Sequence, residues 1–135
     1  MDRQAIMDIL PHRPPMLLVD EVHLEGESAV GTYTVLGDEF FLQGHFPLQP
    51  VVPGVILCEM LAQSACALFA DSLAGKLPFL TGMDKVRFRR KVLPGDTITF
   101  RSTVARSKPP FYFITGTGLV GDSICLSAEI SFAVP

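Results

Sequence analysis

The stretch that decides the fold is Pro53-Gly-Val-Ile-Leu-Cys-Glu-Met-Leu-Ala-Gln-Ser-Ala-Cys-Ala-Leu-Phe-Ala-Asp-Ser-Leu-Ala74. As a helix it would be apolar on almost every side, with Glu59 and Gln63 as polar interruptions. A helix that is apolar all round is buried rather than laid on a surface. Proline suits the first turn of a helix, and Gly75 provides a stop. The stretch therefore predicts one long buried helix from Pro53 to about Ala74.

Strand patterns lie on both sides of this helix. Two strands are expected before it, at residues 16–22 and 28–36, and a short amphipathic helix at residues 2–10 precedes them. Four more strands are expected at 79–88, 97–105, 111–119 and 123–132, because turn signals such as Pro94-Gly95-Asp96 separate these apolar runs. No helical pattern alternates with the late strands, which argues against a doubly wound sheet. We predict an α+β fold in which an antiparallel β-sheet wraps around one long central helix.

Composition limits the size and surroundings of the protein. With 135 residues, the chain is expected to form one domain spanning residues 1–135. Charged residues make up 19%, against about 25% in a typical protein. This deficit suggests that another subunit covers part of the surface. The formal net charge of −3 argues against a general nucleic-acid-binding protein, which would be basic.

Further composition features address location and metals. The first residues lack the basic and then apolar order of a signal peptide, and Glu59 and Gln63 break the apolar helix, so we expect no membrane span and a cytoplasmic location. The three cysteines have no paired spacing, which indicates neither a disulfide framework nor a zinc site. We expect Cys58, inside the apolar helix, to act as a small hydrophobic residue.

Four residues suggest acid–base chemistry. Glu59 stands among apolar helical neighbours, and burial would raise the pKa of its carboxyl group as a general acid requires. Gln63 follows four residues later on the same helical face and could orient that carboxyl. His45 lies in a loop between Gly44 and Phe46 and can take a proton near neutral pH. Gly54 would expose a backbone N–H at the helix start, where an oxyanion can bind.

Each of these residues also has an ordinary structural explanation. Glu59 could simply reach a rim, His45 could be structural, and Gly54 could only start the helix. Taken together, however, they supply the base, the acid and the amide donors for removing a proton beside a carbonyl group and expelling a hydroxyl group. The other two histidines, His12 and His23, lack such surroundings, and we expect them to be structural or exposed.

A cluster of positive charge follows the helix. Five of the eleven basic residues lie within seven positions: Lys85, Arg87, Arg89, Arg90 and Lys91. On a regular strand Lys85, Arg87 and Arg89 would share one face. A solvated outer face is the default explanation. In a net acidic protein, such a stripe could also recognise a phosphate group or an acidic partner.

Motifs along nearly the whole chain resemble the β-hydroxyacyl-acyl carrier protein dehydratases of the FabZ type, which adopt the hotdog fold. The matching stretches are Leu10-Pro-His-Arg13, Leu17-Leu-Val-Asp20, Gln43-Gly-His-Phe-Pro47, Pro53-Gly-Val55, Glu59-Met-Leu-Ala-Gln63, Asp84-Lys-Val-Arg-Phe88 and Pro94-Gly-Asp96. They occur in the order found in the family, and the spacing between the histidine and the glutamate also matches. The glutamate favours this type over the related dehydratase-isomerases, which carry aspartate there.

The resemblance implies a single hotdog dehydratase domain and assigns roles to the candidate residues. His45 would be the catalytic base, Glu59 the catalytic acid, and Gly54 the amide donor to the thioester oxygen. Water would leave a (3R)-3-hydroxyacyl group on acyl carrier protein, giving the trans-2-enoyl thioester in fatty-acid biosynthesis. No metal or cofactor is implied, because phosphopantetheine arrives on the substrate carrier.

The resemblance also implies partners. In this family the histidine of one subunit works with the glutamate of its dimer partner, so a homodimer is expected, assembled further as a trimer of dimers. The basic residues Arg87, Arg89, Arg90 and Lys91 are the expected docking residues for acyl carrier protein.

Several alternatives remain open from the sequence. A hotdog acyl thioesterase, a non-catalytic acyl-carrier-binding protein, and a dehydratase of a specialised polyketide or lipid pathway would share much of this pattern. Two segments also depart from the family: Leu48-Gln49 replaces the usual Gly-Asn beside the active-site loop, and Lys108-Pro-Pro-Phe-Tyr-Phe113 is unusually low in charge.

Overall fold

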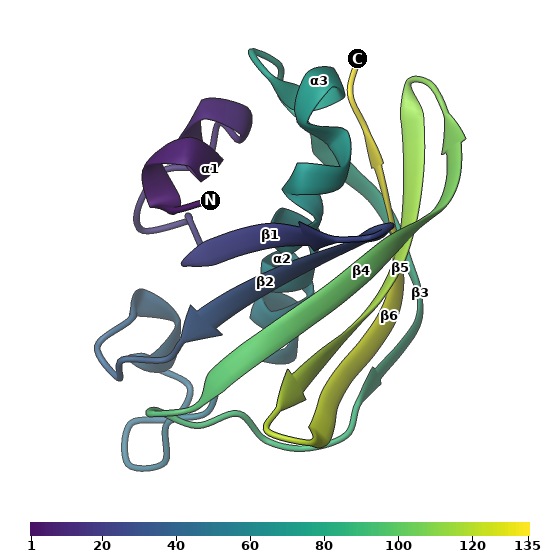
Figure 1. The fold of residues 1–135 in the computed structure, drawn as a ribbon. Coiled ribbons are helices and arrows are strands. Elements are labelled where there is room, and N and C mark those ends of the chain that lie inside the picture. Colours follow the sequence, from purple (N-terminus) through teal and green to yellow (C-terminus); the bar gives the residue numbers. More distant parts are fainter.

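The computed structural model describes all residues from Met1 to Pro135. One antiparallel sheet of six strands curves around a helical segment that lies in its concave face (Figure 1). The strand order is β1-β2-β4-β5-β6-β3, so β1 and β3 form the two edges. The elements are α1 (Arg3–Ile9), β1 (Glu21–Glu25), β2 (Ser28–Thr34), η1 (Phe40–Leu42), α2 (Gly54–Ser64), η2 (Ala65–Phe69), α3 (Ala70–Leu73), β3 (Phe79–Phe88), β4 (Thr97–Lys108), β5 (Phe111–Val120) and β6 (Ser123–Ala133).

The predicted architecture is confirmed, including the wrapped antiparallel sheet and the central helix. The core forms where the inward residues of the sheet meet the helix, and its largest fully buried side chains include Met60, Leu61 and Phe100. Gly116 lets the helix approach closely, because a Cβ there would lie 2.7 Å from Cδ1 of Leu61. Close packing of α2 against the sheet therefore fixes which helical face turns away from it.

The central helix runs from Gly54 to Leu73, close to the predicted bounds, but it is not α-helical throughout. The α-helix ends at Ser64, five residues of 3₁₀ helix follow, and α3 ends at Leu73 before Gly75 adopts a φ of 75°. The Ser64 hydroxyl donates to the carbonyl oxygen of Met60 at 2.7 Å. Such back-bonding competes with the helical ladder and often bends helices, which accounts for the change of pitch here.

The first predicted strand is also displaced. Residues 16–19 belong to no strand, and β1 begins only at Glu21. Leu17, Leu18 and Val19 are all buried, whereas a half-buried strand would alternate. The segment therefore runs through the core and is held by side chains of the helices rather than by a sheet ladder.

The segment Gly54–Leu73, with a mean hydropathy of 1.4, is the one helical segment of the chain with the length and apolar character of a membrane span. Half of an 18-residue stretch of this segment is buried inside the fold. The core helix of a globular protein meets the same criteria.

Candidate active site

The loop after η1 holds His45 by two hydrogen bonds to one residue. The backbone N–H of Val51 donates to the carbonyl oxygen of His45 at 2.9 Å, and the imidazole Nδ1 lies 3.0 Å from the carbonyl oxygen of Val51. A carbonyl oxygen only accepts, so Nδ1 carries the proton in this contact. In the neutral ring, Nε2 then has the free lone pair. The ring also stacks on Phe46, with the centroids 4.3 Å apart. This arrangement gives His45 the tautomer of a base acting through Nε2.

The loop keeps this geometry despite Leu48-Gln49. Phe46 and Gln49 exchange backbone hydrogen bonds of 3.1 and 3.2 Å, and Leu48 points outward with 95% of its surface exposed. The departure from the family pattern therefore falls on the solvent side of a hydrogen-bonded loop.

Gly54 lies in the same cavity as His45, which has a volume of about 620 Å³. It is the first residue of α2, and its N–H and that of Val55 donate to no backbone carbonyl of the chain. The ring of Phe88 covers Gly54 closely. The first turn of the helix therefore presents free amide donors beside the imidazole.

The basic residues separate into two groups. Arg89, Arg90 and Lys91 line the His45 cavity. Lys85 instead pairs with Glu129 at 3.6 Å, and Arg87 donates to the carbonyl oxygen of Val86. These residues do not follow the regular alternation on which the prediction depended: Lys85 has a φ of 52°, the register of β3 with β6 shifts between Asp84 and Arg87, and Arg89 lies beyond the end of β3.

Glu59 lies in a second cavity of about 310 Å³. Its Oε2 accepts a hydrogen bond from Nε2 of Gln63 at 3.1 Å. The rest of this cavity is mainly apolar and includes Phe69, Phe79 and Phe132. Glu59 thus places a carboxyl group at an apolar hollow large enough for an alkyl chain to enter.

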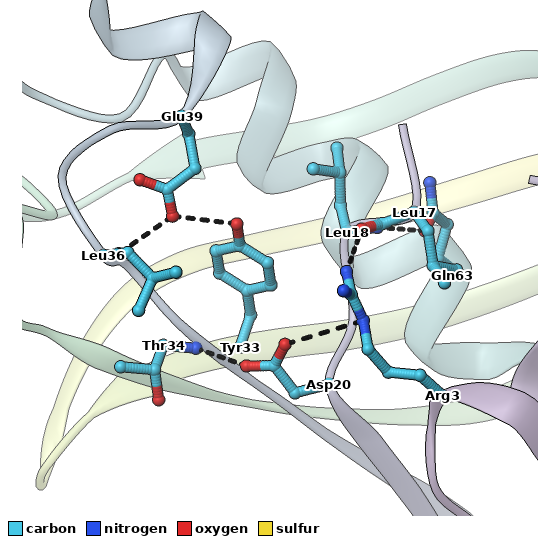
Figure 2. A network of polar contacts seen from close by, with 9 residues as sticks. All are labelled: Arg3, Leu17, Leu18, Asp20, Tyr33, Thr34, Leu36, Glu39 and Gln63. Atoms are coloured by element: carbon cyan, nitrogen blue, oxygen red, sulfur yellow. Dashed lines mark hydrogen bonds and ion pairs between the residues drawn. The ribbon is translucent and has the colours of Figure 1, made fainter. Parts of the chain in front are cut away.

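Gln63 is buried and joins the helix to the segment 16–19 by hydrogen bonds. Its Oε1 accepts from the N–H of Leu18 at 2.8 Å, as Figure 2 shows, and its Nε2 donates to the carbonyl oxygen of Met16 at 2.8 Å. These two backbone partners fix the orientation of the amide, so its remaining N–H must face Glu59. The sequence prediction that Gln63 could orient this carboxyl agrees with that contact.

A second polar network, centred on Glu39, holds the end of β2 and the loop that follows it (Figure 2). Glu39 accepts from the Tyr33 hydroxyl at 2.8 Å and from the N–H groups of Leu36 and Gly37 at 2.9 and 2.8 Å. Burial by itself raises the pKa of Glu39, but these donors outweigh it, so the pKa lies below its ordinary value. Burial and the same carboxylate raise the pKa of Tyr33. The network ties the end of β2 to the loop that leads to His45.

Within one chain, His45 and Glu59 lie in different cavities. Gly54 and Glu59 are five residues apart on α2, which corresponds to a rotation of about 500°, so the two positions face directions about 140° apart around the helix axis. His45 therefore shares its cavity with the helix start, while Glu59 faces another side of the helix. A single chain does not bring the candidate base and acid together.

His12 is the residue that the sequence reasoning missed. Its Nε2 lies 3.7 Å from Oε2 of Glu59, and it lines the same cavity. The sequence reasoning placed His12 outside the candidate site, whereas the structure places it beside the candidate acid. The usable signal was its place within Leu10-Pro-His-Arg13, one of the stretches that carry the family resemblance.

Cys58, Cys66 and Cys125 are free and buried. Burial raises the pKa of all three thiols, and that of Cys66 to about 12. No group of three or more His, Cys, Asp or Glu side chains in the chain could hold a metal ion.

Solved structures with the same architecture define the class of this fold. The dehydratase heterocomplex ApeI:P from Xenorhabdus doucetiae matches with a TM-score of 0.80 and 20% identity, over 96% of this chain and 90% of that one. The PaaI protein of E. coli matches with a TM-score of 0.65 and 19% identity, over 85% and 82% of the two chains. The protein has the hotdog fold.

Sequence relatives narrow the class to a family. Residues 21–122 match the model of the ApeI-like family, described as ApeI dehydratase. Proteins named 3-hydroxyacyl-[acyl-carrier-protein] dehydratase FabZ are 45% identical in Moorella thermoacetica, over 99% of this chain and 96% of the relative, and 45% identical in Clostridium perfringens, over 99% of both. The chain belongs to the FabZ family of dehydratases.

Proposed function

We propose that this dehydratase removes water from a (3R)-3-hydroxyacyl group on acyl carrier protein during fatty-acid biosynthesis, with His45 as base and Glu59 as acid. The observation that carries the residue assignment is the Nδ1 contact of His45 with Val51, which leaves Nε2 free to accept a proton. The amide donors of α2 in the same cavity support the assignment.

The proposed step moves one proton at each end of the new double bond. His45 Nε2 takes the proton from C2, and the N–H of Gly54 stabilises the negative charge that develops on the thioester oxygen. The electron pair of the C2–H bond becomes the second bond between C2 and C3, and the C3–O bond breaks. Glu59 gives its proton to the departing hydroxyl group, which leaves as water. The product is the trans-2-enoyl thioester.

In this proposal the complete active site forms at the interface of a homodimer. Strand β3 is a sheet edge and exposes the apolar side chains of Phe79, Leu80, Met83 and Phe88. An exposed apolar edge strand is prone to pair with another chain. Phe79 and Leu80, at the start of β3, line the Glu59 cavity, whereas Phe88, at its end, lines the His45 cavity.

Antiparallel pairing of two β3 edges brings these cavities together. A two-fold axis places the start of one β3 beside the end of the other. The Glu59 cavity of one protomer then adjoins the His45 cavity of its partner. We therefore propose two active sites per dimer, each with a histidine from one chain and a glutamate from the other.

The carrier would bring its substrate on a phosphopantetheine arm. Acyl carrier protein would dock at the basic rim of the His45 cavity, formed by Arg89, Arg90 and Lys91, and at Arg87, which precedes them on β3. A positive rim suits a phosphodiester and an acidic partner. We propose no metal or organic cofactor, because the acid, the base and the amide donors account for every proton and charge in the step.

Two broader expectations belong to the same proposal. Dimers assemble into a trimer of dimers, and the protein works in the cytoplasm. Three unpaired cysteines in one small chain are compatible with a reducing compartment. Light scattering of the purified protein measures the assembly directly, and a dimer mass would remove the trimer of dimers from the proposal.

The decisive experiment is incubation of the purified protein with (3R)-3-hydroxyacyl carrier proteins of several chain lengths. Mass spectrometry of the carrier should show loss of one water with the thioester intact. A thiol reagent in parallel detects any free carrier thiol, which a hotdog thioesterase would release. Thiol release without loss of water, or no change in any carrier, would overturn the proposal.

A further inference from the structure

The carboxyl group of Glu59 has two polar neighbours, and both approach the same oxygen. Nε2 of Gln63 lies 3.1 Å from Oε2, and Nε2 of His12 lies 3.7 Å from the same atom. Neither residue forms a hydrogen bond with Oε1. The two oxygens of this carboxyl group are therefore not equivalent, which matters for an acid that must deliver its proton from one of them.

Gln63 decides which oxygen can carry the proton. Its Oε1 is occupied by the N–H of Leu18, so its Nε2 is the group that faces Glu59, and an amide nitrogen only donates. In a protonated carboxyl group the carbonyl oxygen accepts such a hydrogen bond better than the hydroxyl oxygen does. The acid proton of Glu59 therefore belongs on Oε1.

His12 is held in place by a rigid segment. The guanidinium of Arg13 donates to the carbonyl oxygens of Leu10 and His12 at 2.8 and 2.7 Å, and to that of Met7 at 3.2 Å. Pro11 and Pro14 restrict the backbone on either side. Because the segment is fixed by its own hydrogen bonds, the imidazole is presented to Glu59 without help from the substrate.

Packing alone does not explain a histidine at this position. Its Nδ1 is buried and has no hydrogen-bond partner in the chain, and an unsatisfied buried polar atom costs free energy. An apolar side chain of similar size would avoid that cost. What a histidine adds is a ring nitrogen, Nε2, at 3.7 Å from Oε2 of Glu59, which can act on that oxygen as a donor when it carries the proton.

We propose that His12 is a positioning residue for the catalytic acid. Together with Gln63, it keeps Oε2 as an accepting oxygen and so leaves the transferable proton on Oε1. His12 reaches no reacting atom itself in this scheme and acts only through Glu59. The inference rests on the proposed role of Glu59 as the acid.

The test compares two substitutions of His12. Gln in His12→Gln retains an N–H donor near the position of Nε2 without an imidazole, whereas His12→Leu keeps the bulk and removes the donor. We expect His12→Leu to lower kcat about tenfold or more, because misdirecting a catalytic group is costly, while KM changes less than about threefold. We expect His12→Gln to recover kcat to within about threefold of the unmodified protein. The matched control is His23→Gln, since His23 is exposed and pairs with Glu25, away from the Glu59 cavity.

A second measurement separates this inference from the proposed function. The Glu59 side chain is labelled with carbon-13, and its carboxyl resonance is assigned by its loss in Glu59→Gln. His12→Leu should shift that resonance and His23→Gln should not, whether or not the protein turns over the substrate. An unshifted resonance, unchanged kcat in His12→Leu, or equal losses in His12→Leu and His12→Gln would each overturn the inference. Absence of dehydration by the unmodified protein would instead overturn the proposed function.

Discussion

The ring of Phe88 closes over Gly54: a Cβ at position 54 would lie 2.7 Å from Cζ of that ring. Phe88 ends β3, and Gly54 begins α2, so this contact joins the sheet edge to the helix start. The space for an oxygen atom beside the Gly54 amide therefore depends on the absence of a side chain there.

The first prediction tests that dependence. Gly54→Ala should lower kcat by about a hundredfold, because the new methyl group must displace the ring or the helix start and thereby disturb the amide donors. Steady-state kinetics of carrier dehydration measure the loss. Phe88→Leu is combined with it to relieve the collision, and the double variant should be more active than Gly54→Ala alone. A double variant no better than Gly54→Ala would show that the collision is not the cause.

The second prediction concerns the proposed base and acid. His45→Ala and Glu59→Gln should each lose nearly all turnover, by about a hundredfold or more, since each removes one proton transfer. The mass and the thermal unfolding midpoint of the assembly should stay close to those of the unmodified protein. Normal dehydration by either variant would remove that residue from the mechanism.

Mixing the two inactive variants is the third prediction. In a mixed dimer, one site contains both substitutions and the other contains neither. Random exchange of equal amounts makes half of the dimers mixed, and half of their sites intact, so about a quarter of full activity should return. Mass spectrometry of the intact assembly verifies the exchange. Confirmed exchange without recovered activity would favour a site within one chain.

The fourth prediction is a pH dependence of stability. Glu39→Gln should lower the free energy of unfolding by about 1–3 kcal/mol at pH 7, because three donors lose their charged acceptor. The pKa of Glu39 is lower in the folded protein than its ordinary value of 4.5, so its contribution is full above that value and fades as pH falls through the folded pKa.

Urea unfolding of both proteins from pH 7 down to pH 3 measures this difference. The gap between them should narrow below about pH 4. Asp38→Asn is the control, since the Asp38 side chain makes no hydrogen bond in the chain and its replacement should change little. A gap that does not depend on pH would contradict the role given to the Glu39 charge.

The thiols provide the fifth prediction. Burial raises the pKa of Cys58, Cys66 and Cys125, so few thiolates exist at pH 8 and alkylation of the folded protein should be very slow. Mass spectrometry after iodoacetamide treatment should find three adducts only when the protein is unfolded. Rapid labelling of Cys58 in the folded protein would reopen a catalytic role for that thiol.

The sequence by itself determined the elements whose signals are local. The alternation and turn residues predicted β3 with its observed bounds, and Pro53, Gly54 and Gly75 marked the ends of the helical segment. These predictions succeeded because backbone restriction and the period of apolar residues act over a few neighbouring positions. The candidate residues His45, Gly54, Glu59 and Gln63 were visible for the same reason.

Only the tertiary structure decided how those residues relate in space. It placed His12 beside Glu59 across 47 positions of sequence, a contact made by the packing of the segment after α1 against α2. It separated His45 from Glu59, because the rotation along α2 directs Glu59 away from the cavity that His45 shares with Gly54. Such relations depend on the burial of side chains from distant segments in one core, and no local pattern records which of them meet.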